Sequence, residues 1–158
     1  MRKLIIIAGS IRMNKEPVEP IAALQRFDGA FARLIRKYKK QLRDSDIFFL
    51  SPAYGMIEAG KKIEYREPTT KDWHKPVLTD SEIRTLREST SVVLEKLFRR
   101  NQYDEIYVNV GKSLWANLQG FEAIFPKTTK VTFAQGRGIG PKMSHMKAWI
   151  ESNFQNRS

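Results

Sequence analysis

Four short apolar runs, each ending in a small or polar residue, constrain the fold of this chain more than any other feature. The runs cover residues 3–8, 46–50, 105–110 and 129–134, and helix-like segments separate them. Continuous apolar runs of this length are typical of strands that are buried on both faces of a sheet. Strands that alternate with helices in this way predict parallel pairing with right-handed crossovers.

The segment between the first two runs predicts an amphipathic helix from about residue 20 to residue 38. Its apolar residues recur at spacings of three and four, which place them on one helix face. An interruption is expected near Asp28 and Gly29, because glycine costs roughly 1 kcal/mol in a helix interior. Residues 56–76 carry glycine, prolines and mixed charge, and predict an irregular segment.

Two further helices are predicted at residues 79–100 and 112–120, and a last helix has Pro141 in its first turn. No internal repeat or linker divides the chain. The sequence therefore predicts a single α/β domain over residues 1–158 in three layers. A mainly parallel sheet of four strands, or slightly more, would have helices on both faces.

The charge of the chain bears on its partners. There are 28 Lys and Arg against 17 Asp and Glu, which gives a formal net charge of +11. A basic excess of this size favours polyphosphate partners through counterion release. The alternative is a basic surface that serves solubility alone. Many basic residues gather in the first predicted helix and its end, where they could track a phosphate backbone: Arg33, Arg36, Lys37, Lys39, Lys40 and Arg43.

Cysteine and hydropathy bear on the compartment. The chain has no cysteine, which excludes disulfides and thiolate catalysis. The apolar run near the N-terminus is only about five residues long, shorter than an export signal requires. No stretch approaches the roughly 18 apolar residues of a membrane span. We expect a cytoplasmic protein with no membrane partner.

In open parallel sheets, ligands bind beyond the carboxyl ends of the strands. The glycine loop at residues 135–142 follows the last predicted strand, and its glycines permit close backbone approach. Lysine and arginine in the loop would add donors to a phosphate. The predicted phosphate-binding residues are Gly136, Arg137, Gly138, Gly140 and Lys142, and a turn without a ligand is the alternative. Gly111, Lys112 and Ser113 look like the end of a Walker loop, but the required earlier glycine is absent, which argues against a nucleotide triphosphatase.

The segment at residues 50–57 follows the second predicted strand. Ser51 would stand at the sheet edge, and Gly55 would let the chain turn back. Tyr54 would then overhang the pocket, where its ring could stack on a base. The alternative is an ordinary loop tyrosine packed on the core. Tyr65 would bring a second aromatic ring to the same rim.

Acid–base candidates are few. Asp28 could activate water or stabilise a cationic sugar during N-glycosidic cleavage. Its alternative is a carboxylate that caps a local turn. The histidines are His74 and His145, and a helical histidine such as His145 more often packs or lies at the surface. Because no cluster of histidine and carboxylates has metal-ligand spacing, we predict no metal and no cofactor.

Two motifs and a later tyrosine form a pattern along the chain. The first motif runs from Ala22 through Phe27-Asp28-Gly29 to Phe31, the second is Leu50-Ser-x-x-Tyr54-Gly55-Met-Ile, and the tyrosine is Tyr65. This pattern resembles the YaaA-related group, whose members are described as peroxide-stress proteins or as a domain of unknown function. The resemblance implies an α/β fold akin to that of uracil-DNA glycosylase. It also implies links to DNA binding, to protection from oxidative damage or to base-modification pathways. The positions that it marks as functional are Ser10, Phe27, Asp28, Ser51, Tyr54, Gly55 and Tyr65.

The chain departs from that group at two of these positions. Relatives often have cysteine where Ser10 stands and tyrosine where Phe27 stands, and this chain has no thiol at position 10. The chain is also shorter than full-length members of the group, and their extra DNA-binding elements are not expected here.

Together these features predict an enzyme that acts on a nucleobase of nucleic acid or of a nucleotide, either as an N-glycosidase (a hydrolase) or by base modification. In this hypothesis Asp28, Ser10 and Ser51 are catalytic. Substrate contacts come from Phe27, Tyr54, Gly55, Tyr65, Gly111 and Lys112. The first alternative is a non-catalytic protein that binds DNA, rather than RNA, and protects it under oxidative stress. A second is a hydrolase of small molecules.

Overall fold

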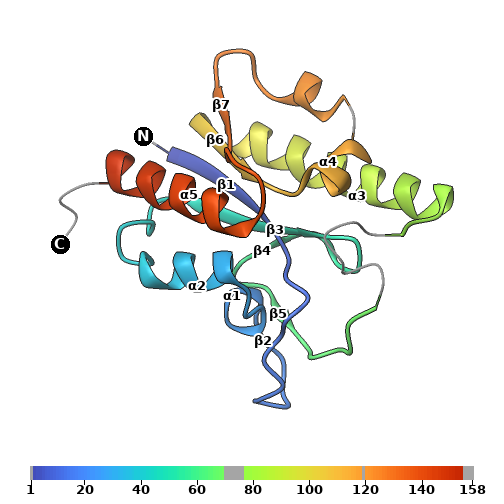
Figure 1. Ribbon diagram of the computed structural model, residues 1–158. Coiled ribbons are helices and arrows are strands. Elements are labelled where there is room, and N and C mark those ends of the chain that lie inside the picture. The colour runs from blue at the N-terminus through green and yellow to red at the C-terminus, as the bar shows by residue number, and fades with distance from the viewer. Residues whose placement is uncertain (1, 70–76, 119, 155–158) are drawn as a thin grey trace.

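A five-stranded sheet forms the centre of the protein (Figure 1), which we describe from a computed structural model for residues 2–69, 77–118 and 120–154. The strand order is β4-β3-β1-β6-β7, and only β4 runs antiparallel to its neighbour. The α/β class and the mainly parallel sheet predicted from the sequence are confirmed. The strands are β1 (Arg2–Ala8), β3 (Asp46–Ser51), β4 (Gly55–Glu58), β6 (Tyr103–Asn109) and β7 (Lys130–Phe133).

Strand β4 corrects the prediction that residues 56–76 form an irregular segment. The segment that we expected to be irregular from residue 56 begins instead with β4, which returns from β3 as a hairpin. Gly55 makes this return possible, because its φ of 70° lies in the left-handed region that favours glycine. A two-residue strand, β5 (Lys62–Ile63), follows and pairs antiparallel with β2 (Ile21–Ala22). Residues 70–76 of the same segment lie outside the described part of the chain.

Helices cover both faces of the sheet (Figure 1). Alternate residues of β1 point to opposite faces, so Ile5 and Ile7 join one buried cluster while Leu4 and Ile6 join the other. The cluster with Ile5 and Ile7 is covered by α1 (Ala23–Arg26), α2 (Ala30–Lys37) and α5 (Ile139–Asn153). The cluster with Leu4 and Ile6 is covered by α3 (Asp80–Arg100), α4 (Lys112–Ala116) and the 3₁₀ turn η2 (Phe121–Ile124).

In the described ranges, no helix combines the length and the apolar character that crossing a membrane requires.

The helix predicted at residues 20–38 is interrupted near Asp28 and Gly29, as the sequence predicted. Phe27 is extended and ends α1, and Gly29 is the N-cap of α2. A Cβ atom on Gly29 would lie 2.5 Å from the Cβ atom of Ser10, so the close approach of these two segments requires glycine. Helix α2 ends at Lys37, within one residue of the predicted end, and the basic residues at 39–43 lie in turns.

Helix α5 is held to the sheet by a buried carboxylate on β6. Glu105 accepts hydrogen bonds from Trp149 of α5 at 3.0 Å, from Lys3 of β1 at 3.2 Å and from Thr132 of β7 at 2.5 Å. Burial raises the pKa of Glu105, but these hydrogen bonds outweigh it and the pKa is lowered. Helices α2 and α5 pack side by side (Figure 1). Because both follow parallel strands, both begin at the edge of the sheet where those strands end.

Candidate functional site

Three segments that are distant in sequence meet where β1 ends. The backbone N–H of Gly9 donates to the carbonyl of Leu50 on β3 at 2.9 Å. A Cβ atom on Gly9 would lie 3.0 Å from the ring of Phe27 and 3.1 Å from the Cβ atom of Ser51. The ends of β1, α1 and β3 are therefore in contact, as the sequence predicted for the carboxyl edge of a parallel sheet.

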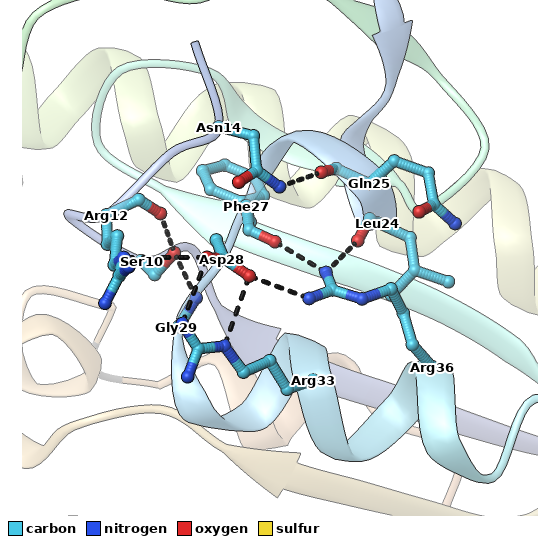
Figure 2. Close-up of polar contacts among 10 residues, drawn as sticks. All are labelled: Ser10, Arg12, Asn14, Leu24, Gln25, Phe27, Asp28, Gly29, Arg33 and Arg36. Atoms are coloured by element: carbon cyan, nitrogen blue, oxygen red, sulfur yellow. Dashed lines mark hydrogen bonds and ion pairs between the residues drawn. The ribbon is translucent and has the colours of Figure 1, made fainter. Parts of the chain in front are cut away.

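Ser10 fastens the chain after β1 to the start of α2. Its Oγ atom accepts a hydrogen bond from the backbone N–H of Gly29 at 3.1 Å and donates one to the carbonyl of Arg12 at 2.7 Å (Figure 2). Both bonds are local and structural. They fix the position of Arg12 relative to the first turn of α2.

Asp28 lies at the centre of three guanidinium groups, which we call the arginine cluster: Arg12, Arg33 and Arg36 (Figure 2). Arg33 approaches with Nε and Nη2 at 3.2 and 3.0 Å from the two carboxylate oxygens. Nη2 of Arg36 lies 2.8 Å from Oδ1, and Nε of Arg12 lies 3.5 Å from Oδ2. Three cations on one anion leave the cluster with a net positive charge.

The three arginines differ in what else they contact. Nη1 of Arg36 donates to the carbonyls of Leu24 at 2.7 Å and Phe27 at 2.9 Å, so this side chain also joins α1 to α2. The side chains of Arg12 and Arg33 are 72% and 51% exposed, whereas that of Asp28 is 14% exposed. The site therefore presents two arginines to solvent and keeps their counterion inside.

The electrostatics of Asp28 do not suit the acid–base role that the sequence allowed. Its pKa is lowered to about 2, chiefly by the hydrogen bonds from Arg33, with burial acting in the opposite direction and Arg36 adding to the lowering. A carboxyl group with this pKa carries no proton to donate near neutral pH and is a weak base. The alternative given above, a carboxylate that organises a local turn, fits the geometry.

Phe27, which the sequence analysis assigned to substrate contact, is a core residue in this structure. It is 2% exposed, and its ring centroid lies 4.8 Å from that of Phe49. The ring of Tyr54 packs edge-on against Phe27 at 6.1 Å, and its hydroxyl donates to the carbonyl of Glu64 at 3.3 Å. The guanidinium of Arg66 lies 5.1 Å from the Tyr54 ring centroid. Tyr54 thus matches the packed loop tyrosine that was the alternative to base stacking.

Ser51 and Gly55 also have structural roles. Ser51 is buried, and its Oγ atom accepts a hydrogen bond from the N–H of Ala53 at 3.2 Å, within the turn that leads to β4. The Cα–H of Gly55 faces α3, where an added Cβ would lie 3.1 Å from Oγ of Ser89. Ser51 therefore stands at the start of the β3–β4 turn and Gly55 at its end, and both shape the turn.

The remaining predicted substrate contacts lie outside this group. Nζ of Lys15 is 5.7 Å from the ring centroid of Tyr65, which is half-buried. Gly111 is the N-cap of α4 and Lys112 is its exposed first residue, and α4 packs on the face opposite to α2. Among the described residues, no hydrogen bond, ion pair or ring contact joins Tyr65, Gly111 or Lys112 to the arginine cluster.

The glycine loop after β7 is exposed throughout residues 135–140. Gly136 and Gly138 have φ values of 120° and 81°, so the predicted need for glycine at this turn is confirmed. Arg137 is exposed and Lys142 is half-buried. Within the described ranges, no hydrogen bond, ion pair or ring contact joins the loop to the arginine cluster, and its phosphate-binding role remains a prediction.

Arg26 is the buried residue that sequence reasoning missed most clearly. It is fully buried on α1 and has no carboxylate partner among the described residues. An arginine in a short amphipathic helix gives no signal that would predict this position. Its guanidinium group donates to four backbone carbonyls, those of Asn14, Pro17, Glu19 and Ile63, at 2.8–3.2 Å.

The role of His145, left open by the sequence, is a packing one in this structure. Its Nδ1 atom is 2.8 Å from the hydroxyl of Tyr107, and Tyr107 stacks on Trp149 at 4.4 Å. Burial, and then the nearby Glu105, raise the pKa of Tyr107, so its hydroxyl keeps its proton. His74 lies outside the described residues. Across the described chain, no three His, Cys, Asp or Glu side chains are grouped so as to hold a metal ion.

Comparison with known proteins supports the fold alone. No model of a known protein family matches the chain, and no curated protein matches it. A similar solved structure is that of AF0587, a protein of unknown function, with a TM-score of 0.54 and 9% sequence identity. The match covers 97% of this chain and 47% of AF0587, so the chain spans about half the length of that protein. At this identity, the likeness places the chain among α/β proteins with a shared fold.

Proposed function

We propose that the protein binds nucleic acid, and DNA in particular, through the layer formed by α2 and α5 and through the arginine cluster at the edge of that layer. This is the non-catalytic alternative from the sequence analysis. The geometry favours it over a base-directed enzyme, because Asp28, Ser10 and Ser51 are each engaged in local structural contacts.

The observation that carries the proposal is the unequal charge of the two helical layers. Helix α2 has three basic residues and no acidic one, and α5 has two lysines and one glutamate. That glutamate, Glu151, accepts a hydrogen bond from Tyr38 at 2.6 Å. On the opposite layer, α3 has five basic and four acidic residues. A basic composition that served solubility alone would not need to be concentrated on one face.

The arginine cluster adds donors of the kind that phosphate groups require. Guanidinium groups offer a planar fork that matches phosphate oxygens, and they stay charged at all physiological pH values. Arg33, one of the three basic residues of α2 counted above, and Arg12, in the loop after β1, are both exposed at the edge where α5 also begins. Arg12 would extend the cationic layer toward the loops.

A salt titration tests this proposal. The affinity for a DNA duplex of about 20 base pairs, measured by fluorescence anisotropy between about 50 and 200 mM salt, should fall steeply as salt rises. Removing two exposed lysines of the layer, with Lys37→Gln and Lys147→Gln together, should weaken binding and make the slope of log K against log salt shallower by about two.

The matched control removes the same charge from the other layer. Arg99 and Arg100 are exposed at the last turn of α3, and Arg99→Gln with Arg100→Gln should leave both the affinity and the salt slope close to those of the wild type. Equal losses in the two double variants would show that net charge alone drives the binding. A salt-independent affinity, or none, would refute the proposal.

A further inference from the structure

We infer that Arg12 and Arg33 form a site for a single phosphate monoester: the terminal phosphate of a DNA strand or the phosphate of a nucleoside monophosphate. The site is separate from the glycine loop to which the sequence assigned phosphate binding. This inference rests on the proposed function only because it takes the ligand from nucleic acid. The experiment below distinguishes a failure of the inference from a failure of the proposed function.

The two arginines are neighbours because they share one oxygen atom. Nε of Arg12 is 3.5 Å and Nη2 of Arg33 is 3.0 Å from the same atom, Oδ2 of Asp28. Two nitrogen atoms in contact with one oxygen atom cannot be farther apart than the sum of those distances. Figure 2 shows their guanidinium groups on one side of Asp28 and that of Arg36 on the other. A single small anion could therefore contact both.

Each of the two guanidinium groups keeps donors for a ligand. The closest atom of Arg12 to Asp28 is Nε, and Arg33 donates to Asp28 from Nε and Nη2. Within residues 2–69, 77–118 and 120–154, the Nη atoms of Arg12 and Nη1 of Arg33 make no hydrogen bond. The end-on fork of each arginine thus stays available, and this is the edge that binds phosphate oxygens in bidentate pairs.

The charge of the site suits a monoester better than the diesters of a nucleic-acid backbone. Three guanidinium cations and one carboxylate leave a net charge of plus two. A phosphate monoester carries a charge of about −1.5 to −2 near pH 7 and has three free oxygens. A diester carries one charge and has two free oxygens. The monoester is therefore the better match to the net charge of the cluster and to the two forks of Arg12 and Arg33.

Before a ligand arrives, Asp28 holds Arg33 by two hydrogen bonds and Arg12 by a longer ion pair, and Arg36 in turn holds Asp28. Arg36 is fixed by two carbonyls as well as by Asp28, and Ser10 accepts the N–H of Gly29, the residue that follows Asp28. The N–H of Gly29 is therefore already used, so the donors of the site come from side chains. A site ordered in advance loses little entropy on binding.

The experiment compares DNA strands of about 12 nucleotides that differ only in their ends. Strands with a 5′-phosphate, a 3′-phosphate or no terminal phosphate compete for the full-length protein against a labelled strand, and adenosine monophosphate is a fourth competitor. We expect about a tenfold tighter affinity for at least one strand with a terminal phosphate, or competition by the nucleotide at a matching concentration. Which competitor succeeds identifies the source of the phosphate.

Variants assign the effect to the site. Arg12→Gln and Arg33→Gln, each on an exposed side chain, should abolish the preference for a terminal phosphate. They should weaken the phosphorylated strands more than the unphosphorylated strand, so that the ratio of the affinities falls to about one. Lys37→Gln is the control, because it should weaken all strands by the same factor and keep their ratio. Equal affinity for all strands without competition by the nucleotide would overturn the inference, as would a preference that survives Arg12→Gln with Arg33→Gln. The proposed function fails separately, if the DNA duplex of the salt titration shows no salt-dependent binding.

Discussion

Arg33 donates two hydrogen bonds to the carboxylate of Asp28, with Nε 3.2 Å from Oδ1 and Nη2 3.0 Å from Oδ2. The two residues are five positions apart and lie on either side of the N-cap glycine of α2. Because the bond is bidentate, it sets the direction of the guanidinium plane as well as its position. Asp28 thus orients the exposed guanidinium group of Arg33 and keeps that of Arg12 nearby, 3.5 Å away.

Acid should reveal the contribution of Asp28 to stability. Its pKa is about 2 in the folded protein and about 3.9 in an unfolded chain. A carboxyl group whose pKa is lowered by folding stabilises the fold above the unfolded pKa, and this contribution is lost as the pH falls through the folded pKa. We therefore expect the free energy of unfolding of the wild type to fall more steeply between pH 4 and pH 2 than that of Asp28→Asn, in urea denaturation at each pH. Parallel curves for the two proteins would contradict the pairing.

The close approach of Gly29 and Ser10 predicts a pair of compensating substitutions. Gly29→Ala should destabilise the protein by about 1–3 kcal/mol, because the new methyl group would meet the Cβ atom of Ser10 at 2.5 Å. In the double variant Ser10→Gly with Gly29→Ala, that Cβ atom is gone and the steric part of the loss should be recovered. Thermal and urea unfolding of the wild type, both single variants and the double variant give the coupling energy. A coupling energy near zero would show that the two segments are not in contact.

Arg26 should be among the most sensitive positions of the chain. Its replacement by methionine removes the donors to four buried or partly buried carbonyls, which we expect to cost about 3 kcal/mol or more in urea denaturation. Arg26→Lys keeps the charge but not the planar fork, so it should recover little of the loss. Arg100→Met is the control on an exposed arginine and should change stability by no more than about 0.5 kcal/mol. An equal effect at both positions would contradict the burial of Arg26.

The start of α3 offers a local prediction. Thr79 and Glu82 form a capping box: the hydroxyl of Thr79 accepts the N–H of Glu82 at 3.1 Å, and the Glu82 carboxylate accepts the N–H of Thr79 at 3.2 Å. Thr79→Ala should lower stability by about 1 kcal/mol, while Thr79→Ser should keep most of it. Chemical denaturation with helix content as the readout measures both. A loss in Thr79→Ser as large as that in Thr79→Ala would argue against the cap.

Some features of the candidate site could be predicted from the sequence and others could not. The predictable features depend on one residue or its neighbours, and the others depend on contacts between segments that are distant in sequence. A glycine beside Asp28 indicated the break between α1 and α2, because backbone freedom is a property of one residue. The meeting of Gly9 and Ser51 at one edge followed from parallel strands. The burial of Phe27 against Phe49 had no local signal, since it depends on how two distant segments pack.

The same distinction separates what the sequence determined from what only the tertiary structure decided. The order of strands and helices, the need for glycine at turns and the basic charge are written in local patterns, because they depend on residue type and on neighbours within a few positions. The hairpin partner of β4, the burial of Arg26 and the pairing of Asp28 with Arg12 depend on which segments come into contact. A side chain acquires these partners only when the chain has folded around the sheet, since its hydrogen bonds and its exposure are then set by residues distant in sequence.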